Sequence, residues 1–316
     1  MEFAGMADSK IPVSKITVRG RFLREILNWH KAWLEGAGGE KAVLTRATLS
    51  DADMQKVDMR HAAFIDTSFL DADLSYADFG GAEFTRCDFR NATLFRTDFT
   101  GAKLIDVNFQ HSQMPESNFS EARLEGILFR DANLRDSRLY EVRLKSCDFT
   151  NVNLQSSYLN HSVIEECGFN EADLHKCDFY RARFHACRFT GAKLMDANLS
   201  SVQAADIDFR GTECNSAKLG LANLSQSVFC RATMTGCDLR ESNLSAADFS
   251  GAALMNSNFR EACIMATDFR GSVLEGARGL TGRQLARSLT SYSTILPSGA
   301  RGPFVLGKNG EIPLFR

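Results

Sequence analysis

A period of five residues runs through most of the chain. From Leu44 to Leu274, every fifth residue is large and apolar in all but two cases: the 47 positions hold 20 Leu, 19 Phe, 4 Met, 2 Ile, one Ala and one Cys. Two residues before each of these stands Ala, Ser, Cys, Val, Thr or Ile, from Ala42 to Ser272. None of these positions is charged, although 24% of the chain is. Such regularity predicts an internal repeat architecture.

A five-residue period matches neither an α-helix, with 3.6 residues per turn, nor a continuous strand, with a side-chain period of 2. It suits a short extended segment followed by a corner, with one large and one small side chain pointing inward. The separation of two residues between the inward positions is the alternation of a strand. The remaining positions carry Asp, Asn, Arg, Ser, Thr and Gly, which tolerate turns and water.

These residues resemble the pentapeptide-repeat family, whose pattern is A-(D/N)-L-x-x. The segments ADLSY at Ala72–Tyr76 and ANLSS at Ala197–Ser201 match the pattern well. The resemblance implies a right-handed β-helix of square cross-section, in which four pentapeptides make one coil.

The sequence independently supports twenty residues per coil. Phenylalanine recurs at every twentieth residue in a structural core ladder: Phe69, Phe89, Phe109, Phe129, Phe149, Phe169, Phe189, Phe209, Phe229, Phe249 and Phe269. The twenty-residue column that ends at Leu274 contains Leu, Met and Cys but no Phe. A plain five-residue repeat would not distinguish one column from another, whereas four different faces would.

We therefore expect an all-β solenoid: a right-handed quadrilateral β-helix of about 12 coils with short helical caps at both ends, about 55 Å long at the spacing of neighbouring strands. Residues 1–41 form an N-terminal segment with a helical cap, 42–276 the repeat, and 277–316 a C-terminal cap. One core defect is visible, because Ala204 and Cys214 replace large residues within one coil. We expect the loosest packing there.

Both ends of such a rod are unpaired edges that need covering. In the segment Arg21–Glu35, Phe22, Ile26, Trp29 and Trp33 form one helical stripe, which we expect to pack over the first coil. After the repeat, Thr281–Leu289 predicts a short helix with Thr281 as its N-cap. The tail Pro303–Phe315 predicts a hairpin that turns at Asn309-Gly310. The C-terminal cap is alternatively, or additionally, the interface of a homodimer, as in gyrase-directed members of the family that the chain resembles.

The composition indicates in which cellular compartment the protein is expected. There is no apolar run long enough to span a membrane and no apolar core of a secretory signal, so we expect no membrane contact. Nine cysteines, an odd number, without an export signal favour the reducing cytoplasm over a disulfide framework. The repeat carries 24 Lys and Arg against 33 Asp and Glu, so it is acidic, while the C-terminal tail is basic.

Catalytic and metal chemistry are not indicated. Cys167, Cys177 and Cys187 occupy inward positions while His175 and His185 point outward, so their ligating atoms should not converge on a metal ion. We expect the cysteines to be buried free thiols used as small core residues. No phosphate loop, nucleophile elbow or zinc-protease motif is present, and we expect no enzyme activity and no cofactor.

Three outward columns are candidate functional surfaces. Asp58, Asp78 and Asp98 should stack as an acidic ladder, although Asp also suits this turn position. Lys103, Arg123 and Arg143 form a basic column flanked by Asp106, Glu125 and Glu165, which favours a self-neutralised surface. Three tyrosines on successive coils, beside two arginines, form a candidate partner surface or simply suit exposed sheet positions: Tyr140, Tyr158, Tyr180, Arg138 and Arg181.

These features favour a non-enzymatic interaction module that presents a rigid rod surface to a protein partner. The resemblance adds a finer alternative, a DNA-mimicking modulator of DNA gyrase or topoisomerase IV, as in the quinolone-resistance branch of the family; the acidic repeat is compatible with it. A secreted bacterial effector is a second alternative. Direct nucleic-acid binding is not expected, and the identity of the partner does not follow from the sequence.

Overall fold

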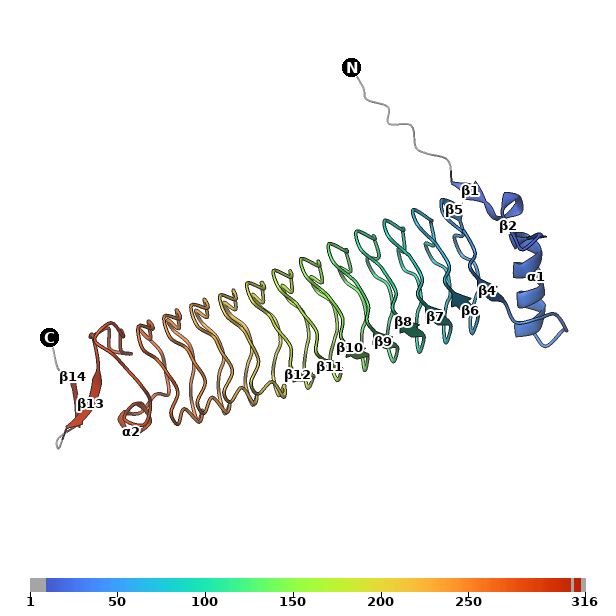
Figure 1. Cartoon of the computed structure of the whole chain (residues 1–316). Helices are drawn as coiled ribbons and strands as arrows, with labels where there is room; N and C mark the ends of the chain where they lie inside the picture. The colour runs from blue at the N-terminus through green and yellow to red at the C-terminus, as the bar shows by residue number, and fades with distance from the viewer. Residues whose placement is uncertain (1–9, 308–309, 314–316) are drawn as a thin grey trace, which may run out of the picture.

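The computed structural model describes residues 10–307 and 310–313. Between the two ends the chain winds into a β-solenoid, with α1 at the N-terminal end of the rod and α2, β13 and β14 at the other (Figure 1). The N-terminal elements are β1 (Ile11–Pro12), the 3-10 helix η1 (Val13–Lys15), β2 (Thr17–Val18), β3 (Arg21–Phe22) and α1 (Leu23–Leu34). The rod carries β4 (Val43–Thr45), β5 (Ala52–Asp53), β6 (Ala63–Ile65), β7 (Glu83–Thr85), β8 (Lys103–Ile105), β9 (Arg123–Glu125), β10 (Arg143–Lys145), β11 (Val163–Glu165) and β12 (Arg183–His185). The C-terminal elements are α2 (Gly282–Leu285), β13 (Phe304–Gly307) and β14 (Gly310–Pro313).

Backbone hydrogen bonds join each coil to the next with a step of twenty residues. On one side, which we call the strand face, β4 and β6 to β12 form one parallel sheet in the order β12-β11-β10-β9-β8-β7-β6-β4. Three further ladders of single parallel bridges start at Thr48, Asp53 and Asp58 and also advance by twenty residues. Four ladders make four sides, so the prediction of a quadrilateral β-solenoid with twenty residues per coil is confirmed.

The corners impose a backbone requirement on the sequence. The second residue after each inward Leu or Phe has a positive φ, for example 56° at Glu171 and 58° at Arg181. A side chain in this left-handed region costs roughly 1 kcal/mol or more unless the surroundings hold it there. At Gly191 an added Cβ would lie 2.3 Å from Oε1 of Glu171 on the preceding coil, so the carboxylate of Glu171 would have to move aside.

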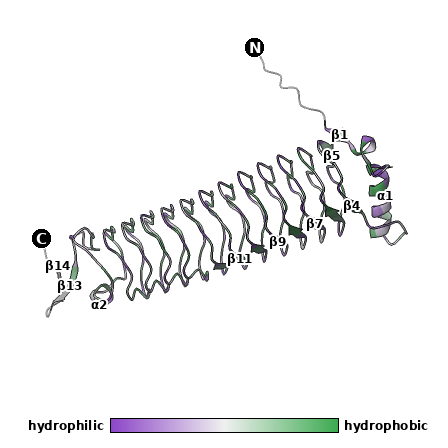
Figure 2. Ribbon diagram, viewed as in Figure 1, coloured by the Kyte–Doolittle hydropathy of each residue, from purple (hydrophilic) through white to green (hydrophobic). Residues whose placement is uncertain are grey.

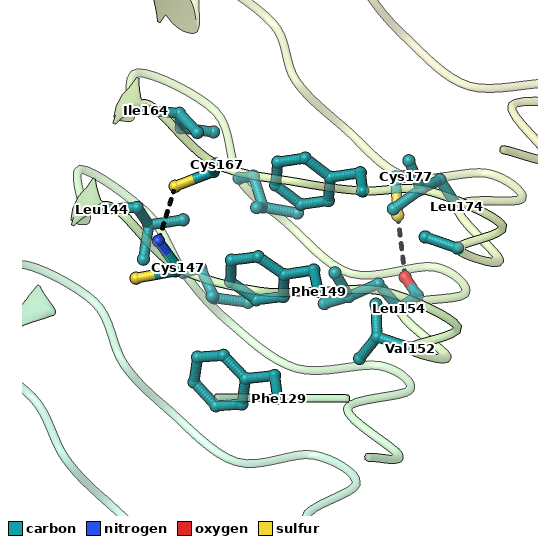
Figure 3. Packing of buried hydrophobic residues seen from close by; sticks show 14 of the residues in the cluster. Phe129, Leu144, Cys147, Phe149, Val152, Leu154, Ile164, Cys167, Leu174 and Cys177 are labelled. Carbon is teal, nitrogen blue, oxygen red and sulfur yellow. Dashed lines mark hydrogen bonds between the residues drawn. The ribbon is translucent and has the colours of Figure 1, made fainter. Parts of the chain in front are cut away.

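The core is a set of stacked side chains that continues from coil to coil. In the phenylalanine ladder, the rings of Phe129 and Phe149 lie 4.8 Å apart and those of Phe149 and Phe169 lie 4.7 Å apart, nearly parallel (Figure 3). Cys147 and Cys167 lie beside them, and the backbone N–H of Cys147 donates to Sγ of Cys167 over 3.4 Å. Apolar and polar residues alternate along the whole rod, as Figure 2 shows, because only the inward half of each segment is buried.

The strand face changes character at the predicted core defect. Three-residue strands end with β12, and the next coil is joined to it there only by the single bridge from Arg183 to Gln203. Phe184, which stacks above Ala204, is 6% exposed, whereas the other inward phenylalanines are at most 1% exposed. Looser packing at this coil stays a prediction.

The N-terminal cap contains a helix where one is expected, but a different face of it is buried. Leu23 and His30 are buried against the first coil, with Leu27 partly buried beside them. The predicted packing of the apolar stripe over the first coil is confirmed for Ile26 and Leu27, which pack against the core, but not for the tryptophans: Trp29 is 52% and Trp33 is 38% exposed. The residues of the buried face are Leu23, Leu27 and His30, and each follows a residue of the stripe by one place. One residue corresponds to about 100° around a helix, so the two faces lie about a quarter turn apart.

His30 closes the edge of the first coil. Along the rod, the small inward residue donates its N–H to the preceding segment, as Ala62 does to the carbonyl of Met59 over 3.1 Å. Ala42 has no preceding segment and donates instead to Nδ1 of His30 over 3.0 Å. Nε2 of His30 in turn lies 3.0 Å from the carbonyl oxygen of Arg60. A neutral imidazole with its proton on Nε2 therefore satisfies two edge groups.

The remaining edges are covered by short segments. β1 pairs in parallel with β5, which extends a second side of the rod at its N-terminal end. At the other end, Leu289 and Ile295 continue two ladders by pairing with Asp268 and Val273.

The C-terminal cap contains the predicted hairpin strands and a helix that is shorter than predicted, because α2 covers only Gly282–Leu285 of the expected Thr281–Leu289. Thr281 caps α2 as predicted, with its side chain accepting from the N–H of Gln284. β13 and β14 form the predicted antiparallel pair, but the predicted turn position is wrong for Gly310, which begins β14 and pairs with Gly307; Asn309 lies outside the described residues. Dimerisation through this cap stays a prediction.

We expect the N-terminal cap to loosen in mild acid through His30. Burial lowers the pKa of His30 below its ordinary value of 6.5. The unfolded chain then binds the proton more readily, so the stability that His30 contributes is complete above pH 6.5 and declines as the pH falls through 6.5 towards the folded pKa. Protonation also removes the acceptor at Nδ1 that Ala42 uses.

The two tryptophans, both in α1, provide the measurement, as emission against pH between 8 and 4.5. His30→Asn should lower the stability of the cap by about 2 kcal/mol at pH 8 and flatten the pH dependence. His111→Gln, a change at an exposed histidine on the rod, is the control and should behave as wild type. A wild-type cap that is equally stable at both ends of this range would contradict the assignment.

Candidate protein-binding surface

The predicted inward cysteines lie in the interior of the rod. Cys87, Cys147, Cys167, Cys177 and Cys187 are buried, which confirms their predicted inward positions. Burial raises the pKa of the Cys87 and Cys187 thiols to about 11, so they stay protonated and unreactive at neutral pH. His185 is exposed on the outside of the same coils. Within the described part of the chain, no three His, Cys, Asp or Glu side chains are placed to hold a metal ion.

Two of the candidate surfaces lie on one side of the rod. The ladder that starts at Asp58 continues through Asp78 and Asp98 to Asn118, and from there to Arg138, Tyr158 and Asp178 by successive parallel bridges. We call this column the Asp58 ladder. The acidic ladder and the tyrosine patch are therefore consecutive parts of a single surface, acidic near the N-terminal end and aromatic with basic residues farther along.

The acidic part of the Asp58 ladder is held by turn hydrogen bonds and by one arginine. Oδ1 of Asp78 accepts the N–H of Gly80 over 2.9 Å, and Oδ1 of Asp98 accepts that of Thr100 over 2.7 Å. These bonds support the structural explanation for aspartate at this position. Arg60 forms an ion pair with Asp58 over 2.8 Å and approaches Asp78 at 3.6 Å.

The pKa values follow from these contacts. The hydrogen-bonded guanidinium of Arg60 lowers the pKa of Asp58. The pKa of Asp78 is raised, first by burial and then by repulsion from Asp98 and Asp58. Arg60 thus neutralises the charge of Asp58 at the N-terminal end of the ladder. The ionised carboxylate of Asp78 is the one that its burial and its acidic neighbours destabilise.

The aromatic part gathers at a corner. Tyr140, His161 and Tyr180 come from three successive coils, and their ring centroids are separated by 5.7 Å and 5.9 Å in edge-to-face arrangements. The guanidinium of Arg181 lies 5.0 Å from the ring centroid of Tyr180, a cation–π contact. We call these four residues the aromatic edge. The phenol of Tyr140 hydrogen-bonds Glu141, which raises its pKa.

Tyr158 and Arg138 flank the aromatic edge on the Asp58 ladder. Their backbones pair directly, and Tyr158 is 52% exposed. All five residues of the predicted partner surface therefore lie together, although only Tyr140, Tyr180 and Arg181 belong to the aromatic edge. Exposed tyrosine and arginine in one cluster are the residue types that dominate binding energy at protein interfaces.

Sequence reasoning missed two parts of this surface pattern. His161 fills the gap between Tyr140 and Tyr180 because it stands one place later in its pentapeptide than either tyrosine. A second aromatic contact joins Tyr76 and Phe95 at a different corner, with their ring centroids 5.3 Å apart. In both cases the signal available in the sequence is a spacing of 19 or 21 residues between outward aromatic rings, rather than 20.

Comparison with solved structures returns other solenoids. HetL, described as a pentapeptide repeat protein involved in heterocyst differentiation regulation from the cyanobacterium Nostoc, is 21% identical over 79% of this chain and 93% of its own, with a TM-score of 0.30. A trypsin-treated form of QnrB1, described as a plasmid-mediated fluoroquinolone resistance protein, is 21% identical over 62% of this chain and 90% of its own, with a TM-score of 0.31. No curated protein matches the chain significantly by sequence.

Family models cover most of the rod. The model for a pentapeptide repeat region matches residues 82–159. The model for eight copies of the pentapeptide repeat matches residues 30–64, 42–81, 54–91, 165–200, 207–245 and 234–271. These matches span well over half of the chain and coincide with the coils described above, so the chain belongs to the pentapeptide-repeat family.

Proposed function

We propose that the protein is a non-enzymatic interaction module that binds a protein partner through the aromatic edge and the adjoining part of the Asp58 ladder. The observation that carries this proposal is the packing of Tyr140, His161 and Tyr180 on three successive coils, with Arg181 over the last ring. Because each coil is fixed to its neighbours by backbone hydrogen bonds, the cluster is preorganised and loses little conformational entropy on binding. All nine cysteines are free thiols, which supports a reducing compartment such as the cytoplasm as its place of action.

Replacing three tyrosines tests the proposal. Tyr140→Ala/Tyr158→Ala/Tyr180→Ala removes the exposed rings without touching the core, so the rod should remain folded. Proteins captured by the wild type at the aromatic edge should bind this variant at least about tenfold more weakly, since buried interface tyrosines commonly contribute 2 kcal/mol or more.

Tyr76→Ala supplies the matched control, because Tyr76 is also an exposed aromatic residue but lies at another corner. It should retain every partner. A triple variant that captures the same proteins with the same affinity would refute the aromatic edge as the binding surface.

A DNA-mimicking modulator of DNA gyrase or topoisomerase IV is the finer alternative. Its support is the stacking of Asp58, Asp78 and Asp98 on the same side as the aromatic edge. Its weakness is that Arg60 neutralises one end and Arg138 follows two rungs after Asp98, so the negative stripe is short. Inhibition of gyrase supercoiling at micromolar protein, relieved by Asp78→Asn/Asp98→Asn, would support this alternative. No inhibition would remove it.

A further inference from the structure

The strand face carries a row of cations that the protein leaves unpaired. Lys103, Arg123 and Arg143 begin β8, β9 and β10 and are direct neighbours in the parallel register. They are exposed and stacked at about 4.8 Å per coil. Among the described residues, none of the three has an acidic partner within 4.0 Å. We call them the basic row.

Other outward arginines of the rod form ion pairs with a nearby aspartate. In Asp88-Phe-Arg90 the guanidinium folds back onto the carboxylate two residues earlier, at 2.7 Å. Asp208 with Arg210 and Asp238 with Arg240 repeat the arrangement at 2.6 Å and 2.7 Å. An aspartate two residues earlier therefore neutralises several outward arginines of the rod. The cations of the basic row have no such aspartate. Three stacked like charges oppose folding, so the row is more readily explained by a ligand than by stability.

The basic row lines a shallow groove. A hollow of about 330 Å³ lies over β8 to β11, with the side chains of Lys103, Arg123 and Arg143 along it. The opposite margin holds Glu125, Lys145 and Glu165, which stack on one another in the sheet register. That margin alternates in sign and balances itself, whereas the column of the basic row has only one carboxylate beside it, Glu83 on β7, which neighbours Lys103 in the register. The sequence-based expectation of a self-neutralised surface applies to one margin only.

A second hollow lies at the N-terminal end of the same face. It measures about 440 Å³ and combines apolar side chains with charged ones: Val18, Ile26, Trp29, Ala42 and Val43 with Arg19, Arg21, Glu40 and Lys41. Val43 begins β4, the first strand of the sheet, so this hollow and the groove are aligned along the rod. From β4 to β10 the sheet order takes five steps, which corresponds to about 24 Å between Val43 in this hollow and Arg143.

We propose that the strand face binds an acidic amphipathic α-helix of a protein partner. The helix lies along the rod with an apolar anchor in the hollow beside Trp29 and carboxylates on the basic row. This inference rests on the proposed function as a protein-binding module and adds the face and the chemistry of the partner. The aromatic edge borders the same region, because β10, β11 and β12 begin two or three residues after Tyr140, His161 and Tyr180.

Spacing selects a helix over other acidic ligands. Successive turns of an α-helix present side chains every 5.4 Å or so, close enough to about 4.8 Å for long side chains to follow over three rungs. An extended peptide presents same-side residues about 6.6 to 6.8 Å apart and leaves register at once. A phosphate polymer would place charge beside Glu125 and Glu165 as well as beside the basic row, and those carboxylates would repel it.

A designed peptide provides the direct test. A helix of roughly 20 residues with Leu at about positions 1 and 4 and Glu at about positions 11, 15 and 18 places all five side chains on one side of the helix and matches the distances from the hollow to the three cations. A second peptide with the reversed order covers the opposite direction of the helix. Binding is followed on the full-length Trp33→Phe protein, whose single remaining tryptophan, Trp29, lines the hollow.

We expect saturable binding at micromolar protein with a change in Trp29 emission. Arg123→Glu/Arg143→Glu, and the peptide with Gln in place of Glu, should each weaken binding by at least about tenfold. Lys193→Glu/Lys218→Glu makes the same change in charge on other sides of the rod and should have less than about a twofold effect. Far-UV circular dichroism verifies that each variant is folded.

Three results would overturn the inference. These are no saturable binding of either peptide, equal binding by the Arg123→Glu/Arg143→Glu variant, or tighter binding of a single-stranded oligonucleotide than of the acidic peptides. The proposed function is tested separately: if the groove variant keeps the captured partners while the triple tyrosine variant loses them, only the acidic helix is wrong.

Discussion

The hydrogen bonds between successive coils are the constraint on which the rest of the structure depends. Each strand-like segment has only three extended residues at most, far too few to be stable alone, and it persists because the same segment recurs twenty residues earlier and later. Stacking fixes the side chains as well, since most inward residues meet a side chain of similar size on the next coil and the phenylalanine ladder continues from Phe69 to Phe269. It also creates two open edges. His30 at one end and the segments around Leu289 and Ile295 at the other are therefore as necessary as any core residue.

The same constraint leaves the outer surface free to vary. An outward residue does not pack into the core, so its identity can follow function, but its position is fixed within a grid of about 4.8 Å along the rod. Like charges in one column then repel at every step. The protein relieves this at Arg90, Arg210 and Arg240 by pairing each with the aspartate two residues before it, and does not relieve it at the basic row. The unrelieved repulsion of the basic row and the clustered outward rings both border β10.

The sequence predicts those features of the structure that follow from the five-residue and twenty-residue periods, and misses several of those that do not. The twenty-residue column of phenylalanines and the inward thiols follow from these periods directly, because one register assigns every residue to a side. The orientation of α1 does not, since a helical stripe shows which residues are apolar and not which neighbour covers them; Trp29 and Trp33 of the stripe are exposed, while His30 is buried. His161 was missed for a related reason. Its ring meets Tyr140 and Tyr180 across a corner, where residues one place apart in the repeat converge.

Deleting whole coils and partial coils tests the central claim most directly. Removing residues 210–229 takes out twenty residues and brings Phe249 into register below Phe209, so the rod should remain folded and shorten by about 4.8 Å. Removing residues 210–224 takes out fifteen, keeps the five-residue period, and shifts every later phenylalanine to another side of the rod. The small-angle scattering length and the midpoint of thermal unfolding of the two proteins should therefore differ, with the fifteen-residue deletion unfolding at a markedly lower temperature. If both deletions were equally stable, the twenty-residue register and its phenylalanine ladder would not be what holds the rod together.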